Sequence, residues 1–96
     1  AAASALRPRR AHLGVKLPRD LSGTELARVL QVLGYKVTRQ TGSHMRLATT
    51  ERGEHHVTVP AHGALRVGTL AAILGDVATH FDLAREELAK RLFGSV

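Results

Sequence analysis

The spacing of the apolar residues changes from a helical period to a strand period near Gly34, and this change constrains the fold more than any other feature of the sequence. Between Leu26 and Leu33 the apolar residues recur at i, i+3, i+4 and i+7, which forms one apolar face of a helix. Residues 22–25, Ser-Gly-Thr-Glu, have the pattern of a capping box, and Gly34 suits a left-handed C-cap. The sequence therefore predicts a helix that begins near residue 22 and ends at Gly34.

Three period-two segments, each typical of a strand, follow this helix. The first starts at Tyr35 and ends at the Thr-Gly-Ser turn of residues 41–43. The second starts at His44, and a polar turn at residues 51–54 separates it from the third, which spans residues 55–60. Turns this short join antiparallel neighbours, so the sequence predicts a three-stranded meander.

Alternation along these strands divides their side chains between the two faces of the sheet. One face is predicted to be buried under helices and the other to be open, as is common in antiparallel sheets. The residues predicted to point inward are Val37, Met45, Leu47, Val57 and Val59. The residues predicted on the open face are Lys36, Thr38, His44, Arg46, His56 and Thr58. Two histidines and two cations would therefore share the open face.

Two more helices are predicted after the third strand. The first begins near Gly68 and carries an apolar stripe from Leu70 to Val77. The second spans residues 85–93, and Asp82 is its expected N-cap. The predicted fold class is therefore α+β, with the order α-β-β-β-α, a three-stranded antiparallel sheet, helices on one of its faces and a short C-terminal helix.

The positive charge of the chain is concentrated near its start. The formal charge of +6 comes from 14 basic and 8 acidic residues, and the bases from Arg7 to Arg19 stand among no acids. We therefore predict a basic flexible arm over residues 1–18, followed by one domain over residues 19–96. Residues 1–4, Ala-Ala-Ala-Ser, are as consistent with residues left by cloning as with a native sequence.

The composition excludes several classes of site. The sequence has no cysteine, which excludes disulfides, thiolate catalysis and cysteine zinc sites. It has no P-loop or dinucleotide-binding motif, and His55 and His56 are predicted on opposite faces of a strand, so no metal or cofactor is expected. No apolar run approaches the roughly 20 residues that span a bilayer, which predicts no membrane span and a cytoplasmic protein.

Four motifs occur in a fixed order along the domain. They are Ser-Gly-Thr-Glu-Leu at 22–26 with Leu-Gly-Tyr at 33–35, Gly-Ser-His at 42–44, Val-Pro-Ala-His at 59–62, and Gly-Thr-Leu-Ala-Ala-Ile-Leu at 68–74. Together they resemble the HicA (YcfA-like) toxin ribonucleases of prokaryotic toxin–antitoxin pairs, over roughly residues 19–80. The resemblance implies a fold like that of double-stranded-RNA-binding domains. The arm and the C-terminal helix are longer than in the minimal family domain, and Ala84 stands where the family usually has Ser or Thr.

The resemblance also implies that the protein cleaves messenger RNA, that a HicB-type antitoxin covers its active site, and that His44 is catalytic. RNA supplies its own 2′-hydroxyl nucleophile, so the enzyme needs a base, a proton donor and positive groups, and no metal. An imidazole with a pKa of about 6.5 suits the proton transfers. Arg46 is predicted on the same face about 7 Å away, where it can hold the phosphate. Gly42 and Ser43 offer turn amides for the same purpose.

The remaining site residues are less defined by the sequence. Lys36 adds a cation to the open face, and His56 and His62 are both candidates for the proton donor, although hydrogen bonding to local backbone is the simpler interpretation of His62. Two other functions stay open: an RNA-binding module without chemistry, and a protein-interaction domain that docks an acidic partner. The sequence does not specify the oligomeric state, and a monomer is the default.

Overall fold

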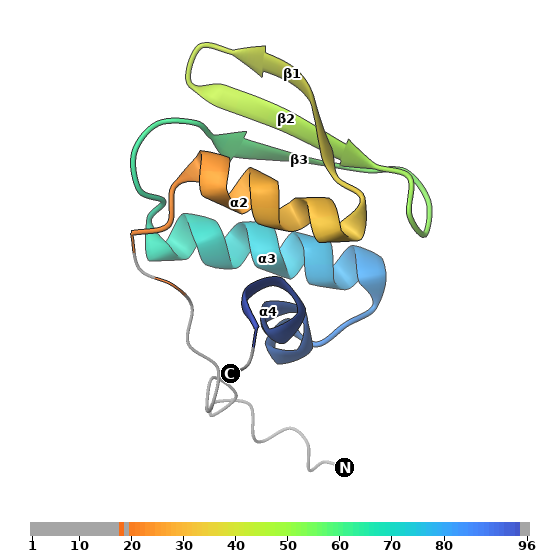
Figure 1. Cartoon of the computed structure of the whole chain (residues 1–96). Helices are drawn as coiled ribbons and strands as arrows, with labels where there is room; N and C mark the ends of the chain where they lie inside the picture. Colours follow the sequence, from red (N-terminus) through yellow and green to blue (C-terminus); the bar gives the residue numbers. More distant parts are fainter. Residues whose placement is uncertain (1–17, 19, 95–96) are drawn as a thin grey trace.

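The fold is a three-stranded sheet covered on one face by helices, as seen in a computed structural model that describes residue 18 and residues 20–94 (Figure 1). Its elements are the helix α2 (Gly23–Leu30), the 3-10 helix η2 (Gln31–Leu33), the strands β1 (Lys36–Thr41), β2 (His44–Thr49) and β3 (His55–Pro60), and the helices α3 (Val67–Phe81) and α4 (Arg85–Phe93). The strands are antiparallel, in the order β1-β2-β3. The predicted α+β fold is confirmed, whereas the predicted arm lies almost entirely outside the described residues.

Helix α2 begins where the capping-box pattern predicts. The Glu25 carboxylate accepts a hydrogen bond from the Ser22 amide (2.9 Å), and the Ser22 hydroxyl accepts one from the Glu25 amide (3.1 Å). The first of these bonds, together with the contact to the Ser22 side chain, holds the pKa of Glu25 below its usual value. The helical segment ends with η2 and a left-handed Gly34 at φ 85°.

The first residue of α2, Gly23, lies against the backbone of β3. A Cβ at this position would overlap the carbonyl oxygen of Pro60 and would lie 2.8 Å from its carbonyl carbon. The absence of a side chain at Gly23 therefore allows α2 to approach the end of β3. Close by, the Leu65 amide donates to the Leu21 carbonyl (2.7 Å), which connects the start of α2 to the loop before α3.

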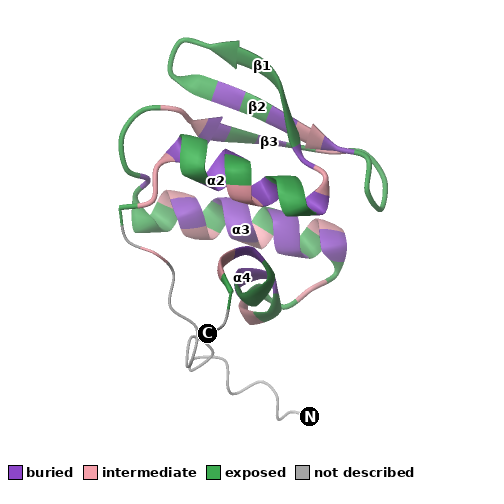
Figure 2. Cartoon of the chain, in the orientation of Figure 1, coloured by how far each residue is buried: buried purple, intermediate pink, exposed green. Residues whose placement is uncertain are grey.

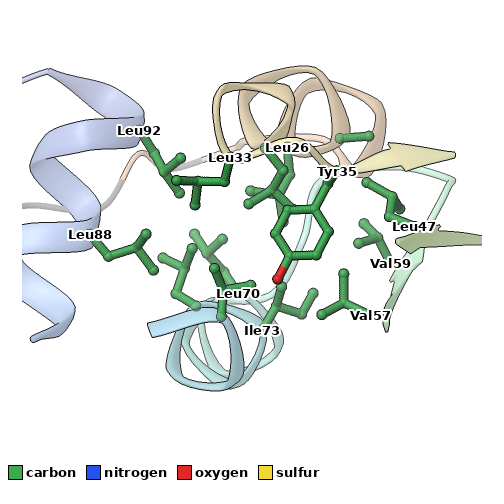
Figure 3. Packing of buried hydrophobic residues seen from close by; sticks show 14 of the residues in the cluster. Leu26, Leu33, Tyr35, Leu47, Val57, Val59, Leu70, Ile73, Leu88 and Leu92 are labelled. Carbon is green, nitrogen blue, oxygen red and sulfur yellow. The ribbon is translucent and has the colours of Figure 1, made fainter. Parts of the chain in front are cut away.

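The core lies between the helices and the inner face of the sheet (Figure 2 and Figure 3). It includes Leu26 and Leu30 of α2, Met45, Leu47, Val57 and Val59 of the sheet, Leu70, Ile73, Leu74 and Val77 of α3, and Leu88 and Leu92 of α4. Four of the five side chains predicted to point inward are thus buried. The exception is Val37, which is 47% exposed because it lies on the edge strand beside an unfilled groove.

A β-bulge in β1 changes which of its side chains share the open face. Val37 pairs with Leu47 and Arg39 pairs with Arg46, so Thr38 is an extra residue between two pairs. The Thr38 hydroxyl donates to the Arg46 carbonyl (3.2 Å). Past the bulge the alternation is shifted by one position, which places Arg39 on the same face as Arg46.

Helix α3 begins within one residue of its predicted start and α4 has its predicted range, but their junction differs from the prediction. Asp82, the predicted N-cap of α4, is instead the left-handed C-cap of α3 at φ 58°, a conformation that aspartate tolerates better than most residues. The N-cap of α4 is Ala84, which makes no side-chain hydrogen bond. No single helix of the described residues is long and apolar enough to cross a membrane; α3 and α4 satisfy length and composition only as a pair bent by 103°.

Candidate functional site

His44 follows a two-residue turn that joins β1 to β2. Gly42 has a φ of 53° and Ser43 a negative φ, which is the pattern of a type II′ turn with glycine first. The pair between Thr41 and His44 closes the turn. The His44 side chain is exposed, and its Nδ1 lies 3.3 Å from the Ser43 hydroxyl. The turn therefore presents the imidazole to solvent at the first position of β2.

A hollow of about 230 Å³ lies beside this turn. It is lined by Arg39 and Thr41 of β1, His44, Met45 and Arg46 of β2, and Thr58 of β3. Arg39 and Arg46 are paired neighbours on adjacent strands, and both side chains are exposed. One imidazole, two hydroxyls and two guanidinium groups thus line one solvent-facing site. Such a set of donors suits the binding of a phosphate.

Arg39 belongs to this site although it was not among the site residues predicted from the sequence. Alternation counted forward from Tyr35 places Arg39 on the inner face, because the count assumes a regular strand. Alternation counted backward from the turn at residues 42–43 places it on the open face with His44. The conflict between the two counts is the sequence signal of an extra residue, and the bulge at Thr38 accounts for it.

Two predicted site residues lie on the open face but far from His44. In the β2–β3 register Pro60 pairs with His44, whereas His56 pairs with Ala48. Four residues of strand separate these positions, a distance of about 13 Å. The Nε2 of His56 also lies 2.7 Å from a Glu54 carboxylate oxygen. The structure therefore does not bring His56 to His44, and Lys36, which also pairs with Ala48, is equally remote.

His62 lies at the same end of the sheet as His44. It follows β3 in an exposed loop, and the amide of the preceding residue, Ala61, donates to the Ser43 carbonyl (2.7 Å). This bond fixes the loop against the turn that carries His44. Of the two histidines predicted as proton donors, His62 is therefore the one whose loop is bonded to the turn that carries His44, although its side chain does not line the hollow.

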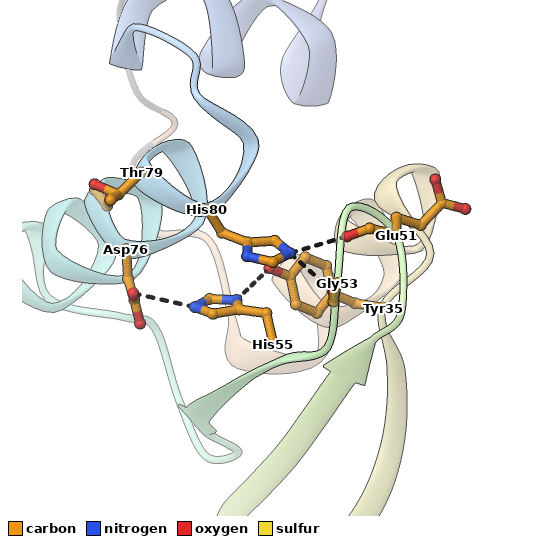
Figure 4. Close-up of polar contacts among 8 residues, drawn as sticks. Tyr35, Glu51, Gly53, His55, Asp76, Thr79 and His80 are labelled. Atoms are coloured by element: carbon orange, nitrogen blue, oxygen red, sulfur yellow. Dashed lines mark hydrogen bonds and ion pairs between the residues drawn. The ribbon is translucent and has the colours of Figure 1, made fainter.

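A second polar cluster lies on the helix side of the sheet, at the other end of β3 (Figure 4). The Tyr35 hydroxyl and the Nδ1 of His55 are 2.7 Å apart, and the Nε2 of His55 lies 3.2 Å from an Asp76 oxygen. With a neutral imidazole, the tyrosine donates to Nδ1, and Nε2 donates to the carboxylate. The ring of His80 stacks on His55 at 4.4 Å between centroids and 11° between planes.

This second cluster has a structural role. Tyr35 is fully buried, so its hydroxyl cannot meet a solute, and its bond to His55 ties the chain before β1 to the start of β3. The His80 Nε2 lies 2.9 Å and 3.1 Å from the carbonyl oxygens of Glu51 and Gly53, so it can donate to both. Together these bonds attach α3 to the β2–β3 turn.

Replacement of Tyr35 with phenylalanine tests this role. Burial, and then the charge of Asp76, raises the pKa of Tyr35 to about 12. The unfolded chain loses this proton near pH 10, so folding stability should fall between about pH 10 and pH 12. Urea unfolding of Tyr35→Phe should show a loss of about 1 kcal/mol at neutral pH and a shallower alkaline decline. An alkaline profile identical to that of the native chain would contradict the assignment.

No group of three metal-ligating side chains converges within the described residues. His55 and His56 have separate partners on the two sides of β3, Tyr35 with Asp76 for the first and Glu54 for the second. This arrangement agrees with the predicted alternation of the two imidazoles.

The chain matches the model of a known protein family. The model of the family described as HicA toxin of bacterial toxin–antitoxin matches residues 23–78, which is more than half of the chain. The chain belongs to the HicA toxin family. The HicA match begins at the first residue of α2 and ends within α3. It includes the whole sheet and the residues that line the His44 hollow, but it ends before His80 of the second cluster. No curated protein and no solved structure matches the chain.

Membership of the HicA family identifies the protein as a toxin of a toxin–antitoxin system, which implies an antitoxin partner. The family match excludes α4, in agreement with the C-terminal extension noted in the sequence. The likeness to double-stranded-RNA-binding domains stays a prediction.

Proposed function

We propose that this toxin is a metal-independent endoribonuclease that cleaves messenger RNA, with His44 as its general acid and base. The observation that supports this most directly is the position of His44. It is an exposed imidazole at the rim of a hollow that also contains Arg39 and Arg46. An imidazole beside two cations meets the chemical needs of phosphodiester cleavage by a neighbouring hydroxyl.

In the proposed reaction His44 removes the proton of the RNA 2′-hydroxyl. The oxygen attacks the adjacent phosphorus, the bond to the 5′-oxygen breaks, and the products carry a 2′,3′-cyclic phosphate and a 5′-hydroxyl. Because Nδ1 is engaged by Ser43, Nε2 is the ring nitrogen proposed to accept the 2′-hydroxyl proton. Arg39 and Arg46 offset the negative charge that grows on the phosphate oxygens. His62, on the adjoining loop, is the proposed donor to the leaving oxygen.

The charges of the site are proposed to set its affinity for RNA. Truncating Arg39 to alanine should remove one phosphate contact, which lowers the slope of log affinity against log salt by about 0.7. Filter binding of RNA by the Arg39→Ala chain at several salt concentrations measures this slope. Arg91→Ala is the matched control, because Arg91 is exposed on α4 and pairs with Glu87. Equal slopes for the two variants would place Arg39 outside the RNA site.

The family implies an antitoxin, and we propose that it is of the HicB type and covers the His44 face. A protein bound there would exclude RNA from the hollow and would neutralise Arg39 and Arg46. Since messenger RNA is the proposed substrate, the proposed place of action is the cytoplasm.

A further inference from the structure

A groove on the helix side of the sheet is distinct from the His44 hollow, with which it shares one lining residue, Met45. It has a volume of about 420 Å³ and runs between α2 and β1; we call it the α2–β1 groove. Its lining includes Ala27 and Arg28 of α2, together with Val37 and Met45 of the sheet. Val37 is partly exposed in this groove, so the groove contains apolar surface that is not buried in the core.

The strand beside this groove has an open edge. Among the residues that the structure describes, β1 pairs with β2 alone (Figure 1), and all six of its residues are exposed (Figure 2). An extended segment can add to such an edge through main-chain hydrogen bonds. Because side chains alternate, those on one face of the segment would enter the groove beside Val37. Those on the other face would lie beside Lys36 and Arg39.

The charges around this edge select the kind of segment. Residues 26–50 contain four basic residues, including Arg28, Lys36 and Arg39, and no acidic residue. None of these three takes part in the ion pairs found among residues 20–94. Glu25 lies one turn before Arg28, but its carboxylate accepts the Ser22 amide. The edge is therefore a positive surface next to an apolar groove.

The positive strand edge and the apolar groove together disfavour two other ligands for this surface. A second copy of β1 would bring Lys36 and Arg39 against like charges, which opposes pairing. RNA would match the charge, but its backbone gains nothing from an open strand edge or from the apolar surface at Ala27 and Val37. A polypeptide strand with acidic side chains uses all three features.

We propose that the α2–β1 groove and the open edge of β1 bind an extended segment of a partner protein in which acidic residues alternate with small apolar residues. The apolar side chains fill the groove beside Val37, and the acidic ones meet Lys36 and Arg39. Met45 lines both the groove and the His44 hollow, and Arg39 borders the hollow, but the proposed binding uses neither His44 nor Arg46 and so does not depend on the ribonuclease reaction.

The probe is an acetylated and amidated peptide of sequence Glu-Val-Asp-Val-Glu-Val-Asp, titrated into the full chain while its backbone amide resonances are followed. We expect saturable shifts confined to β1 and α2. Val37→Glu, which puts a carboxylate at the groove, should weaken binding about tenfold or more. Val32→Glu is the matched control, because Val32 is 67% exposed on η2 and does not line the groove. The Val32→Glu chain should bind the peptide with unchanged affinity. Circular dichroism should show that both variants are folded.

Two further peptides separate strand addition from simple charge attraction. The same peptide with alternate amides methylated keeps its charges but cannot complete the ladder, so it should bind about tenfold more weakly. The peptide with lysine in place of each acid should not bind. Equal binding of the methylated peptide, shifts centred on His44 instead of β1, or equal shifts of the α2 resonances on addition of an RNA oligonucleotide would each overturn the proposal.

Discussion

Replacement of His44 with alanine should lower RNA cleavage by about 10²–10⁴-fold, the usual contribution of one general acid–base group. RNA binding should persist, since Arg39 and Arg46 keep their charges. Folding stability should also persist, because the His44 ring is exposed and makes one side-chain hydrogen bond within the described residues, with the Ser43 hydroxyl. The test is single-turnover cleavage of end-labelled RNA, with filter binding of the same RNA beside it.

His56→Ala is the control for this experiment. His56 is a second exposed histidine on the same face, but it pairs with Ala48 and contacts Glu54, remote from the hollow. The His56→Ala chain should cleave RNA at the native rate. Undiminished cleavage by His44→Ala would refute the proposed role of His44.

Cleavage and binding assays on the native chain distinguish the alternative functions. Cleavage that survives a chelator and leaves cyclic phosphate ends agrees with the 2′-hydroxyl route. RNA binding without cleavage would instead favour a non-catalytic RNA-binding module. Failure to bind RNA at low salt, with retained binding of an acidic protein partner, would favour the protein-interaction domain.

The largest expected effect on stability comes from Gly23→Ala, which should cost about 3 kcal/mol or more. The new methyl group would overlap the Pro60 carbonyl oxygen, and that oxygen belongs to strand backbone that cannot rotate away. Either α2 or the end of β3 must shift. The end of β3 also positions Ala61 against Ser43, so a shift there should disturb the turn that carries His44. Urea unfolding measures the loss.

Gly68→Ala is the matched control, because it is the same substitution in the first turn of another helix. A Cβ at Gly68 would meet no atom within 4 Å, and alanine is the better helix former. This variant should be as stable as the native chain or up to about 1 kcal/mol more stable. Equal unfolding midpoints for the Gly23→Ala and Gly68→Ala chains would contradict the close approach of α2 to β3.

Most of the fold follows from local signals in the sequence. The capping box at Ser22 and the cap at Gly34 predict both ends of the first helical segment, and alternation predicts four of the five inward side chains correctly. The prediction for Asp82 was wrong because aspartate suits an N-cap and a left-handed C-cap alike. Local residue preference could not choose between the two, since the packing of α3 decides where that helix ends.

The site was less predictable than the fold. Alternation in β2 places Arg46 on the face of His44, as the structure does, because β2 is regular. It could not show that His56 lies about 13 Å from His44, since that distance depends on the β2–β3 register. It also could not show the partners of His55, because Asp76 comes from a helix distant in sequence.

The bulge in β1 has a consequence for comparing this chain with other members of the family. Thr38 is the residue whose deletion would leave both neighbouring pairs, Val37 with Leu47 and Arg39 with Arg46, in register. A relative with a β1 one residue shorter can therefore keep the same open face. An alignment that places the gap opposite Gln40 instead of Thr38 would align Arg39 with an inward residue of the relative. It would then indicate a missing cation, although the relative lacks only the unpaired bulge residue.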